Sequence, residues 1–209
     1  MRRIVLIVAV AVAMLVAGSL VALAVSSRFT DAGGSAGPSG AATATADPVS
    51  ANDYCYVEAM IFYRVSESRN AKVLLGKSGI DADARDFATA TAERADAELV
   101  DLRAWYVSWG GANPAEPPVD GPCAGHGAEH AQMPGIPSWA QRQRLADAQD
   151  PATAQRLFAQ LLHDQHAGML ALIAQVLDDQ ADPRVRASAT AAREQAAADD
   201  AILERIAAA

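Results

Sequence analysis

Four long stretches of the chain repeat apolar residues at the three- and four-residue spacing of an amphipathic helix. In the clearest, Phe158–Leu177, the apolar side chains form a single stripe: Phe158, Leu161, Leu162, Met169, Leu172, Ile173 and Val176. Gln165 lies in the middle of this stripe, and His166 lies at its edge. Because polar groups are seldom placed on a buried face without a partner, this helix is expected to carry the informative chemistry.

Capping and breaker residues indicate where the two helices before a central loop begin and end. Asp53 is the expected N-cap of a first helix over about residues 53–76, and a second helix is predicted over about residues 83–109. Gly110-Gly111 then stops the second helix, because glycine ends helices readily. The segment 112–137 is rich in proline and glycine and is predicted to be a long loop.

Three further helices are predicted after the loop. Ser138 is the expected cap of a short helix over residues 139–148. Asp150-Pro151 and Asp182-Pro183 each place an acidic cap before proline, the residue favoured at the first helical position. These signals open the long helix that contains Phe158–Leu177 and a last helix that ends at about Ala208.

The two long helices on each side of the loop suggest an internal duplication, since Tyr56–Met60 echoes Phe158–Leu162. Neither pair of helices can bury its apolar face alone, so the two pairs are expected to pack together. The predicted fold class is therefore all-α, with an antiparallel four-helix bundle built from two duplicated helix pairs.

The other three long helices have stripes that are more polar than a plain core requires. The predicted stripes are, in the first helix, Tyr56, Met60, Tyr63, Glu67 and Leu74 with Arg64 at the edge; in the second, Phe87, Thr91, Arg94, Glu98, Leu102 and Trp105; and in the last, Ser188, Ala191, Gln195, Ala198, Ile202 and Ile206. The middle of the bundle is thus predicted to hold a polar core: Tyr63, Arg64, Glu67, Arg94, Glu98, Gln165, His166 and Gln195.

Buried charges need partners, and the spacing offers some locally. Arg64 and Glu67 are three residues apart and Arg94 and Glu98 four apart, so each pair is expected to interact on its own helix. The leading hypothesis is that the planar guanidinium of Arg64 satisfies Glu67, Glu98 and Gln165 with its five donors. The alternative is that these are surface charges on helices that are rotated differently.

The chain begins with an apolar run that predicts a membrane segment. Ile4–Val25 contains about 22 residues without a charge, which is long enough to cross a bilayer as a helix. Arg2 and Arg3 precede it, so the N-terminus is expected in the cytoplasm and the remainder outside. A signal peptide cleaved near Ala22-Leu23-Ala24 is the alternative, and it would release a secreted protein.

The predicted organisation is a membrane anchor over residues 1–27, a flexible Gly-, Ala- and Ser-rich linker over 28–50, and a helical domain over 51–209. Both cysteines, Cys55 and Cys123, fall on the exported side. A disulfide between them is expected in an oxidising compartment, and a pair of soft metal ligands is the alternative.

Composition and motifs limit the function. The chain has 209 residues, of which 51% are hydrophobic, and a net charge of -8. An acidic chain without a basic patch is not expected to bind nucleic acid. There is no Glu-x-x-His pair for a di-iron site, no phosphate-binding glycine loop and no nucleophile elbow, so an enzyme is not expected.

From about Asp53 to Ile206 the chain resembles the domain-of-unknown-function 305 (DUF305) family in four motifs that occur in the family's order. The matching segments are Asp53–Arg64, Trp105–Gly110, His126-Gly127 with Met133–Ile136, and Leu161–Met169. The resemblance implies an exported, ferritin-like helical bundle. The family's doubled histidines also imply metal binding, with copper the usual proposal.

The sequence departs from the family at those histidines. Tyr63-Arg64 stands at the first pair and Gln165-His166 at the second, so one of four imidazoles remains. The carboxylate of the second helix is retained as Glu98, whereas its counterpart in the last helix falls at Ala198. The polar core is therefore interpreted as the replacement of an ancestral metal site in a non-enzymatic, membrane-anchored protein.

A residual metal site is the main alternative. His163 and His166 lie on neighbouring turns of one helix, and His126, His130 and Met133 could close over them from the loop, a ligand set suited to copper or zinc. A second alternative is a protein interaction module at the cell envelope. The alanine-rich last helix would then accept a partner helix, which a second copy of the chain could supply.

Overall fold

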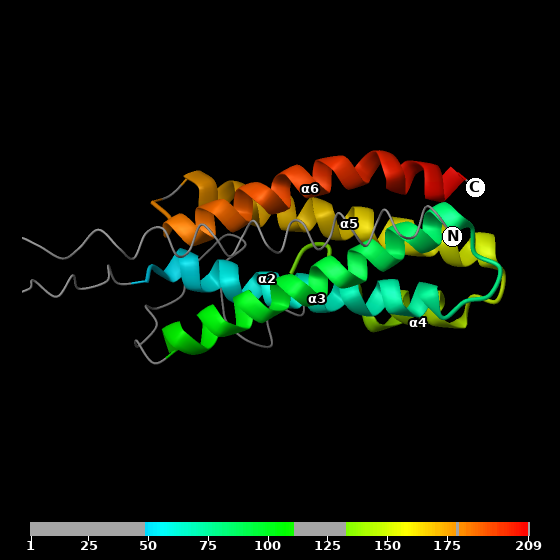
Figure 1. Ribbon diagram of the computed structural model, residues 1–209, viewed down its shortest axis with the longest axis horizontal. Coiled ribbons are helices and arrows are strands. Elements are labelled where there is room, and N and C mark those ends of the chain that lie inside the picture. The colour runs from blue at the N-terminus through cyan, green and yellow to red at the C-terminus, as the bar shows by residue number, and fades with distance from the viewer. Residues whose placement is uncertain (1–48, 111–132, 179, 209) are drawn as a thin grey trace, which may run out of the picture. The chain divides into compact units, whose positions relative to one another are not determined.

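The computed structural model describes residues 49–110, 133–178 and 180–208. These residues form helices and connecting loops with no strand among them: α2 (Ala51–Leu75), α3 (Ala82–Gly110), α4 (Trp139–Asp147), α5 (Pro151–Asp178) and α6 (Pro183–Ala208) (Figure 1). The prediction of an all-α fold is confirmed, and the predicted helix boundaries agree with the observed ones within a few residues.

Local side-chain caps explain where most helices begin. The Ser138 hydroxyl accepts a hydrogen bond from the backbone N–H of Gln141 at the start of α4. The Asp150 carboxylate accepts one from the N–H of Thr153, 2.9 Å away, at the start of α5. Both contacts are the predicted N-caps, because a side-chain oxygen satisfies an N–H that has no partner within the helix.

The prediction for the first helix is wrong in its cap. Ser50 is the N-cap of α2, and Asp53 is the third helical residue, completing a capping box in which each side chain accepts from the other's backbone N–H. The second carboxylate oxygen of Asp53 accepts a hydrogen bond from the N–H of Asp182 at 2.9 Å. Asp53 therefore ties the start of α2 to the start of α6.

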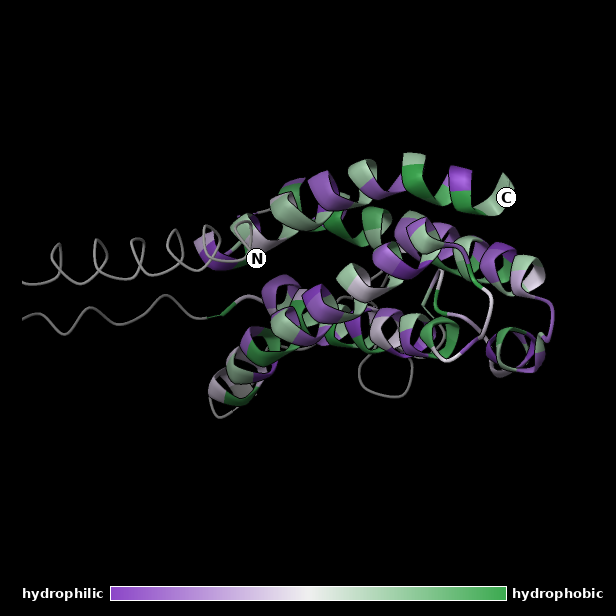
Figure 2. Cartoon of the chain, turned by 45° about the vertical axis from the view of Figure 1, so that its right-hand side comes forward, coloured by the Kyte–Doolittle hydropathy of each residue, from purple (hydrophilic) through white to green (hydrophobic). Residues whose placement is uncertain are grey.

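Helix α2 is the central element of the domain, since it contacts each of the other four described helices. Helix α3 lies along α2, and α6 lies along α5 (Figure 1). Hydrophilic and hydrophobic residues alternate along the helices in Figure 2, as expected for helices with one polar and one apolar face. The predicted stripe of α5 is buried along its whole length, including Gln165 and His166.

The apolar core is divided into two clusters by a band of polar residues. One cluster gathers side chains from the first part of α2 and α6 and the later parts of α3 and α5, among them Tyr56, Met60, Leu102, Met169, Ile173 and Val185. The other gathers the opposite ends of the same helices, among them Leu74, Phe87, Phe158, Leu162, Leu203 and Ile206. The band between them crosses all four long helices near their middles.

Helix α6 is rotated by about one residue from its predicted orientation. Its buried residues are Val185, Ala189, Ala192, Ala196, Asp199, Leu203 and Ile206, whereas Ala191 and Ala198 of the predicted stripe are exposed. An alanine-rich helix has few large side chains to define its apolar face, so its sequence specifies the rotation weakly. Asp199 is consequently buried, while Asp200, whose side chain is 42% exposed, lies at the edge of the core beside His166.

The described end of the central loop, residues 133–137, packs tightly on α5. Pro134 and Gly135 lie against Gly168, where an added Cβ would collide with the carbonyl oxygen of Pro134. The same carbonyl accepts a hydrogen bond from the Tyr63 hydroxyl at 2.8 Å. Met133 is thereby held in the first apolar cluster.

Several predictions concern residues outside the described ranges. They include the membrane span Ile4–Val25, nearly all of the linker, and the loop residues that contain Cys123, His126 and His130. The Cys55–Cys123 disulfide therefore stays a prediction. Within the described ranges, no helix combines the length and the apolar character needed to cross a bilayer.

Candidate functional site

The band between the two apolar clusters is the candidate site, and we call it the polar layer. It consists of Arg64 and Glu67 on α2, Arg94 and Glu98 on α3, Gln165 and His166 on α5, and Gln195, Asp199 and Asp200 on α6. Each helix contributes because its apolar stripe is interrupted at mid-length by polar residues. Ionic groups inside a protein are tolerated only when they are paired, so the pairing decides what the layer does.

Arg64 is the central cation of the layer and is only 1% exposed. Its Nε donates to Glu98 Oε2 and its Nη1 donates to Glu67 Oε2, both at 2.7 Å. Burial alone would lower the pKa of Arg64, but attraction to Glu67 and Glu98 and the hydrogen bonds to them raise it overall. The guanidinium is thus permanently charged and links α2 to α3.

The third predicted partner of Arg64 bonds elsewhere. The amide nitrogen of Gln165 donates to the backbone carbonyl of Tyr63 at 3.0 Å, which links α5 to α2. Among the described residues, Gln165 Oε1, Arg64 Nη2 and Glu67 Oε1 are buried without a hydrogen-bond partner. The expected satisfaction of Gln165 by the guanidinium is therefore corrected, while the contacts of Arg64 with Glu67 and Glu98 are present.

The predicted pairing of Arg94 with Glu98 is wrong. Arg94 Nη2 instead donates to Asp199 Oδ2 at 2.8 Å, and Gln195 Nε2 donates to the other oxygen of Asp199 at 2.8 Å. Arg94 and Gln195 are half-buried, whereas Asp199 is buried. The rotation of α6 explains the change, because it turns Asp199 toward α3 while Arg64 occupies Glu98.

His166 lies between two carboxylates from different helices. Its Nε2 is 3.7 Å from Glu67 Oε1, and its Nδ1 is 3.6 Å from Asp200 Oδ1. Both distances fall within ion-pair range but exceed a hydrogen bond, and each contact becomes an ion pair only when the ring is protonated. The imidazole ring lies between the two carboxylates, and each carboxylate approaches a different ring nitrogen. The two carboxylates are therefore not placed to bind one ion together.

The candidate metal ligands do not converge in the described structure. His163 is exposed, in a surface pocket beside Ala159 and Leu203, whereas His166 is buried in the polar layer. Met133 is packed among apolar side chains. In residues 49–110, 133–178 and 180–208, no three His, Cys, Asp or Glu side chains are grouped to hold a metal ion. The exposed His163 and the buried His166 therefore lie in different surroundings, and the positive charge of Arg64 would oppose a cation bound beside His166.

Two tyrosines beside the layer predict a stability loss at high pH. Burial raises the pKa of Tyr56 and of Tyr63 to about 12, above the value of about 10 for an unfolded chain. Folding thus favours the protonated phenols. Their contribution is fully present below about pH 10 and is lost as the pH rises through about 12.

We expect the free energy of unfolding, measured by urea titration, to fall between pH 10 and pH 12. The fall should be less steep in Tyr63→Phe, which has one phenol fewer to ionise. A free energy that stays constant over this range in the wild-type protein would contradict the assignment of these buried phenols.

Sequence reasoning missed Asp199 and Asp200, although a signal for Asp199 was present. Asp199 continues the three- and four-residue spacing of Val185, Ala189, Ala192 and Ala196. Because alanine occupies several faces of α6, a second stripe fitted the pattern equally well. The buried position of Asp199 follows from its bonds to Arg94 and Gln195, which only the packed structure reveals.

Comparison with known proteins identifies relatives of this fold. A family model described as Domain of unknown function (DUF305) matches residues 53–206. The crystal structure of a DUF305 fragment from Deinococcus radiodurans is similar with 23% identity and a TM-score of 0.63, covering 77% of this chain and 98% of that chain. A putative secreted DUF305 protein from Streptomyces coelicolor has 15% identity and a TM-score of 0.60, with 74% and 90% covered.

A third similar structure is CopM in the Cu(II)-bound form. It has 15% identity and a TM-score of 0.56, and the match covers 74% of this chain and 95% of that chain. No curated protein matches the chain. At these identities the structural likeness establishes a shared fold.

Proposed function

Because this chain belongs to the DUF305 family, we propose that it is an extracytoplasmic, non-enzymatic domain held at the membrane by its N-terminal apolar segment. Export is supported by the charge pattern of Arg2, Arg3 and Ile4–Val25 and by the similar putative secreted protein of Streptomyces coelicolor. We further propose a ferritin-like antiparallel four-helix bundle derived from two duplicated pairs. The packing of α3 along α2 and of α6 along α5 supports it.

The proposed role of the polar layer is to join the helices through its own ion pairs, in the place where family members are expected to hold a metal. The observation that carries this proposal is the buried guanidinium of Arg64, bonded at 2.7 Å to both Glu67 and Glu98. A cation that belongs to the chain bonds both carboxylates and offsets one of their two negative charges, and Glu98 is partly exposed to water, so the layer is proposed to need no bound ion.

Metal analysis tests the proposal. The full-length chain, purified without a histidine tag and measured by elemental mass spectrometry, is expected to carry no stoichiometric transition metal. The same result is expected after incubation with copper followed by dialysis, because Arg64 opposes a second cation in the layer. One tightly held copper per chain would contradict the proposal.

Copper handling is the second candidate. It is favoured by the fold shared with CopM and by the buried His166 Nδ1 and Glu67 Oε1, which have no hydrogen-bond partner among the described residues. The proposed ligands would be His163 and His166 with Met133, His126 and His130. Copper titration should then saturate at a fixed ratio, and the double variant His163→Ala/His166→Ala should lose affinity. Equal affinity in both proteins would exclude this set.

A further inference from the structure

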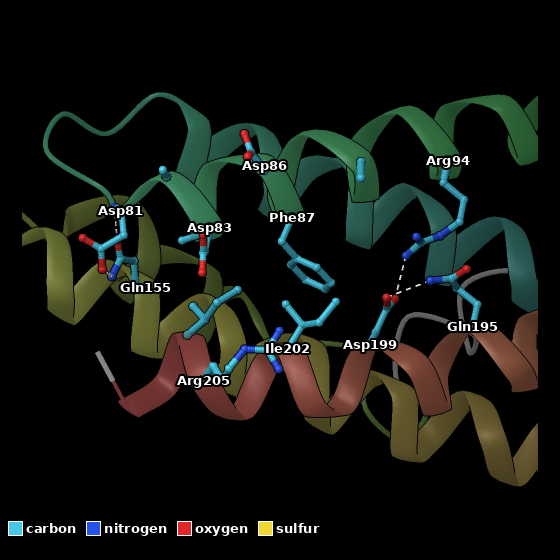
Figure 3. Close-up of a pocket in the computed structure, with 14 residues that line it drawn as sticks. Asp81, Asp83, Asp86, Phe87, Arg94, Gln155, Gln195, Asp199, Ile202 and Arg205 are labelled. Carbon is cyan, nitrogen blue, oxygen red and sulfur yellow. Dashed lines mark hydrogen bonds and ion pairs between the residues drawn. The ribbon is translucent and has the colours of Figure 1, made fainter.

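A pocket of about 670 Å³ opens between the first half of α3 and the second half of α6 (Figure 3). It forms because α3 packs along α2 and α6 packs along α5, while α3 and α6 touch each other only slightly. Its volume lies in the range of about 300–1,000 Å³ that small-molecule sites occupy. Neither membership of the DUF305 family nor the proposals about the polar layer and copper assign a role to this pocket.

The inner surface of the pocket is apolar. Phe87 of α3 and Ile202 of α6 face each other across it (Figure 3). Ile206, four residues after Ile202 on α6, also lines the pocket. The ring of Phe87 is held edge-on against Phe158, with centroids 6.3 Å apart and planes at 69°. A rigid surface of this kind suits an aromatic ring or a branched hydrocarbon.

Polar contacts close the two ends of the pocket (Figure 3). At one end Gln155 donates to the Asp81 carboxylate at 2.9 Å and accepts from the Asp81 backbone N–H at 2.6 Å. At the other end Arg94 donates to Asp199. These contacts hold the walls in place. Arg94 and Asp199 offset each other's charge, whereas Asp81 keeps its negative charge because Gln155 is a neutral amide.

The remaining charge of the lining is negative. Once Arg94 and Asp199 are paired, the charged side chains of the lining are Asp81, Asp83, Asp86 and Arg205, so negative charges outnumber positive ones by three to one. Asp83 lies in the first turn of α3, where a carboxylate also stabilises the helix terminus. That local role explains the presence of Asp83. It does not explain the excess of negative charge over the whole lining, and this excess favours a cationic ligand.

We propose that this pocket binds a small organic cation with an apolar body, such as a primary amine attached to an aromatic or branched aliphatic group. The body packs between Phe87 and Ile202, and the ammonium lies on the acidic side of the pocket near Asp83. An anion of the same shape is disfavoured by the net charge, and a neutral analogue lacks the electrostatic contribution.

Calorimetric titration of the full-length chain in lipid nanodiscs, with empty nanodiscs as the blank, tests the proposal. The probes are 2-phenylethylamine, 2-phenylethanol and phenylacetate, which share the ring and differ in charge. The amine is expected to bind saturably and more tightly than either analogue, and its affinity should fall as salt is added. Equal binding of all three probes, tightest binding of phenylacetate, or no saturable binding of the amine would overturn the proposal.

Variants localise the site. Asp83→Asn is expected to weaken amine binding about two- to fivefold, the range of an exposed ion pair. Glu93→Gln is the matched control, since Glu93 is an exposed acid of the same helix outside the lining, and its affinity should be unchanged. Ile202→Lys places a tethered ammonium in the pocket and should abolish binding, with circular dichroism verifying the fold. The proposal fails if a folded Ile202→Lys variant binds the amine normally or if Asp83→Asn has no effect.

Discussion

Arg64→Met is expected to destabilise the protein by about 3–5 kcal/mol, the cost of removing one partner from a buried ion pair. Methionine retains the apolar stem but leaves the carboxylate of Glu67, which is 0% exposed, without its counter-charge. Urea unfolding followed by circular dichroism measures the effect. Glu98 contributes less to the loss, because its side chain is 35% exposed and water can solvate it.

Two further variants make the result specific. Lys72→Met removes the cation of an ion pair with Asp96 that is also 2.7 Å long but exposed, so it should cost only about 0–1 kcal/mol. The double variant Arg64→Met/Glu67→Gln removes both buried charges and should recover much of the stability lost in Arg64→Met. If Arg64→Met costs no more than Lys72→Met, the polar layer does not join the helices as proposed.

Gly168→Ala is the second large effect, with an expected loss of about 1–3 kcal/mol. The new methyl group would collide with the Pro134 carbonyl, so residues 133–137 would have to move off α5. That movement would break the hydrogen bond from Tyr63 and expose Met133. Thermal unfolding measures the loss, and near-ultraviolet circular dichroism reports the changed surroundings of Tyr63.

Gly76→Ala is the matched control for this substitution. Its added Cβ would meet only the carbonyl oxygens of Val73 and Lys72, at 3.5 and 3.7 Å, and Gly76 has an ordinary helical φ of -73°. Alanine restricts the unfolded chain there, so the variant should be unchanged or more stable by about 0.4–1 kcal/mol. If both substitutions have the same effect, residues 133–137 are not held on α5 by close packing at Gly168.

Both substitutions, at Arg64 and at Gly168, concern residues in or near the polar layer. The buried ion pairs of Arg64 lie between two apolar clusters, and residues 133–137 cover the α5 side near the same level through Tyr63 and Gly168. A helix that slid along its neighbour would remove these charges from their partners, at a cost of several kcal/mol. The layer therefore favours one alignment of the helices, which uniform alanine and leucine contacts would specify less strongly.

The sequence by itself determined the features that depend on neighbouring residues. The five described helices, the caps at Ser138 and Asp150, and the buried stripe of α5 with Gln165 and His166 were all predictable. Each follows from interactions within a few residues of one helix, namely backbone capping and the spacing of large apolar side chains. Large residues such as Phe158 and Leu162 define the face of α5 without reference to any other helix.

Only the tertiary structure decided the rotation of α6, the partner of Arg94 and the packing of Pro134 against Gly168. Arg94 and Asp199 are 105 residues apart in the sequence, and α6 has too few large side chains to reveal in advance which acid turns inward. A glycine within a helix likewise shows that space is available but not which backbone fills it. These features arise when separate helices meet, because a buried charge and a close backbone contact both require a partner from elsewhere in the chain.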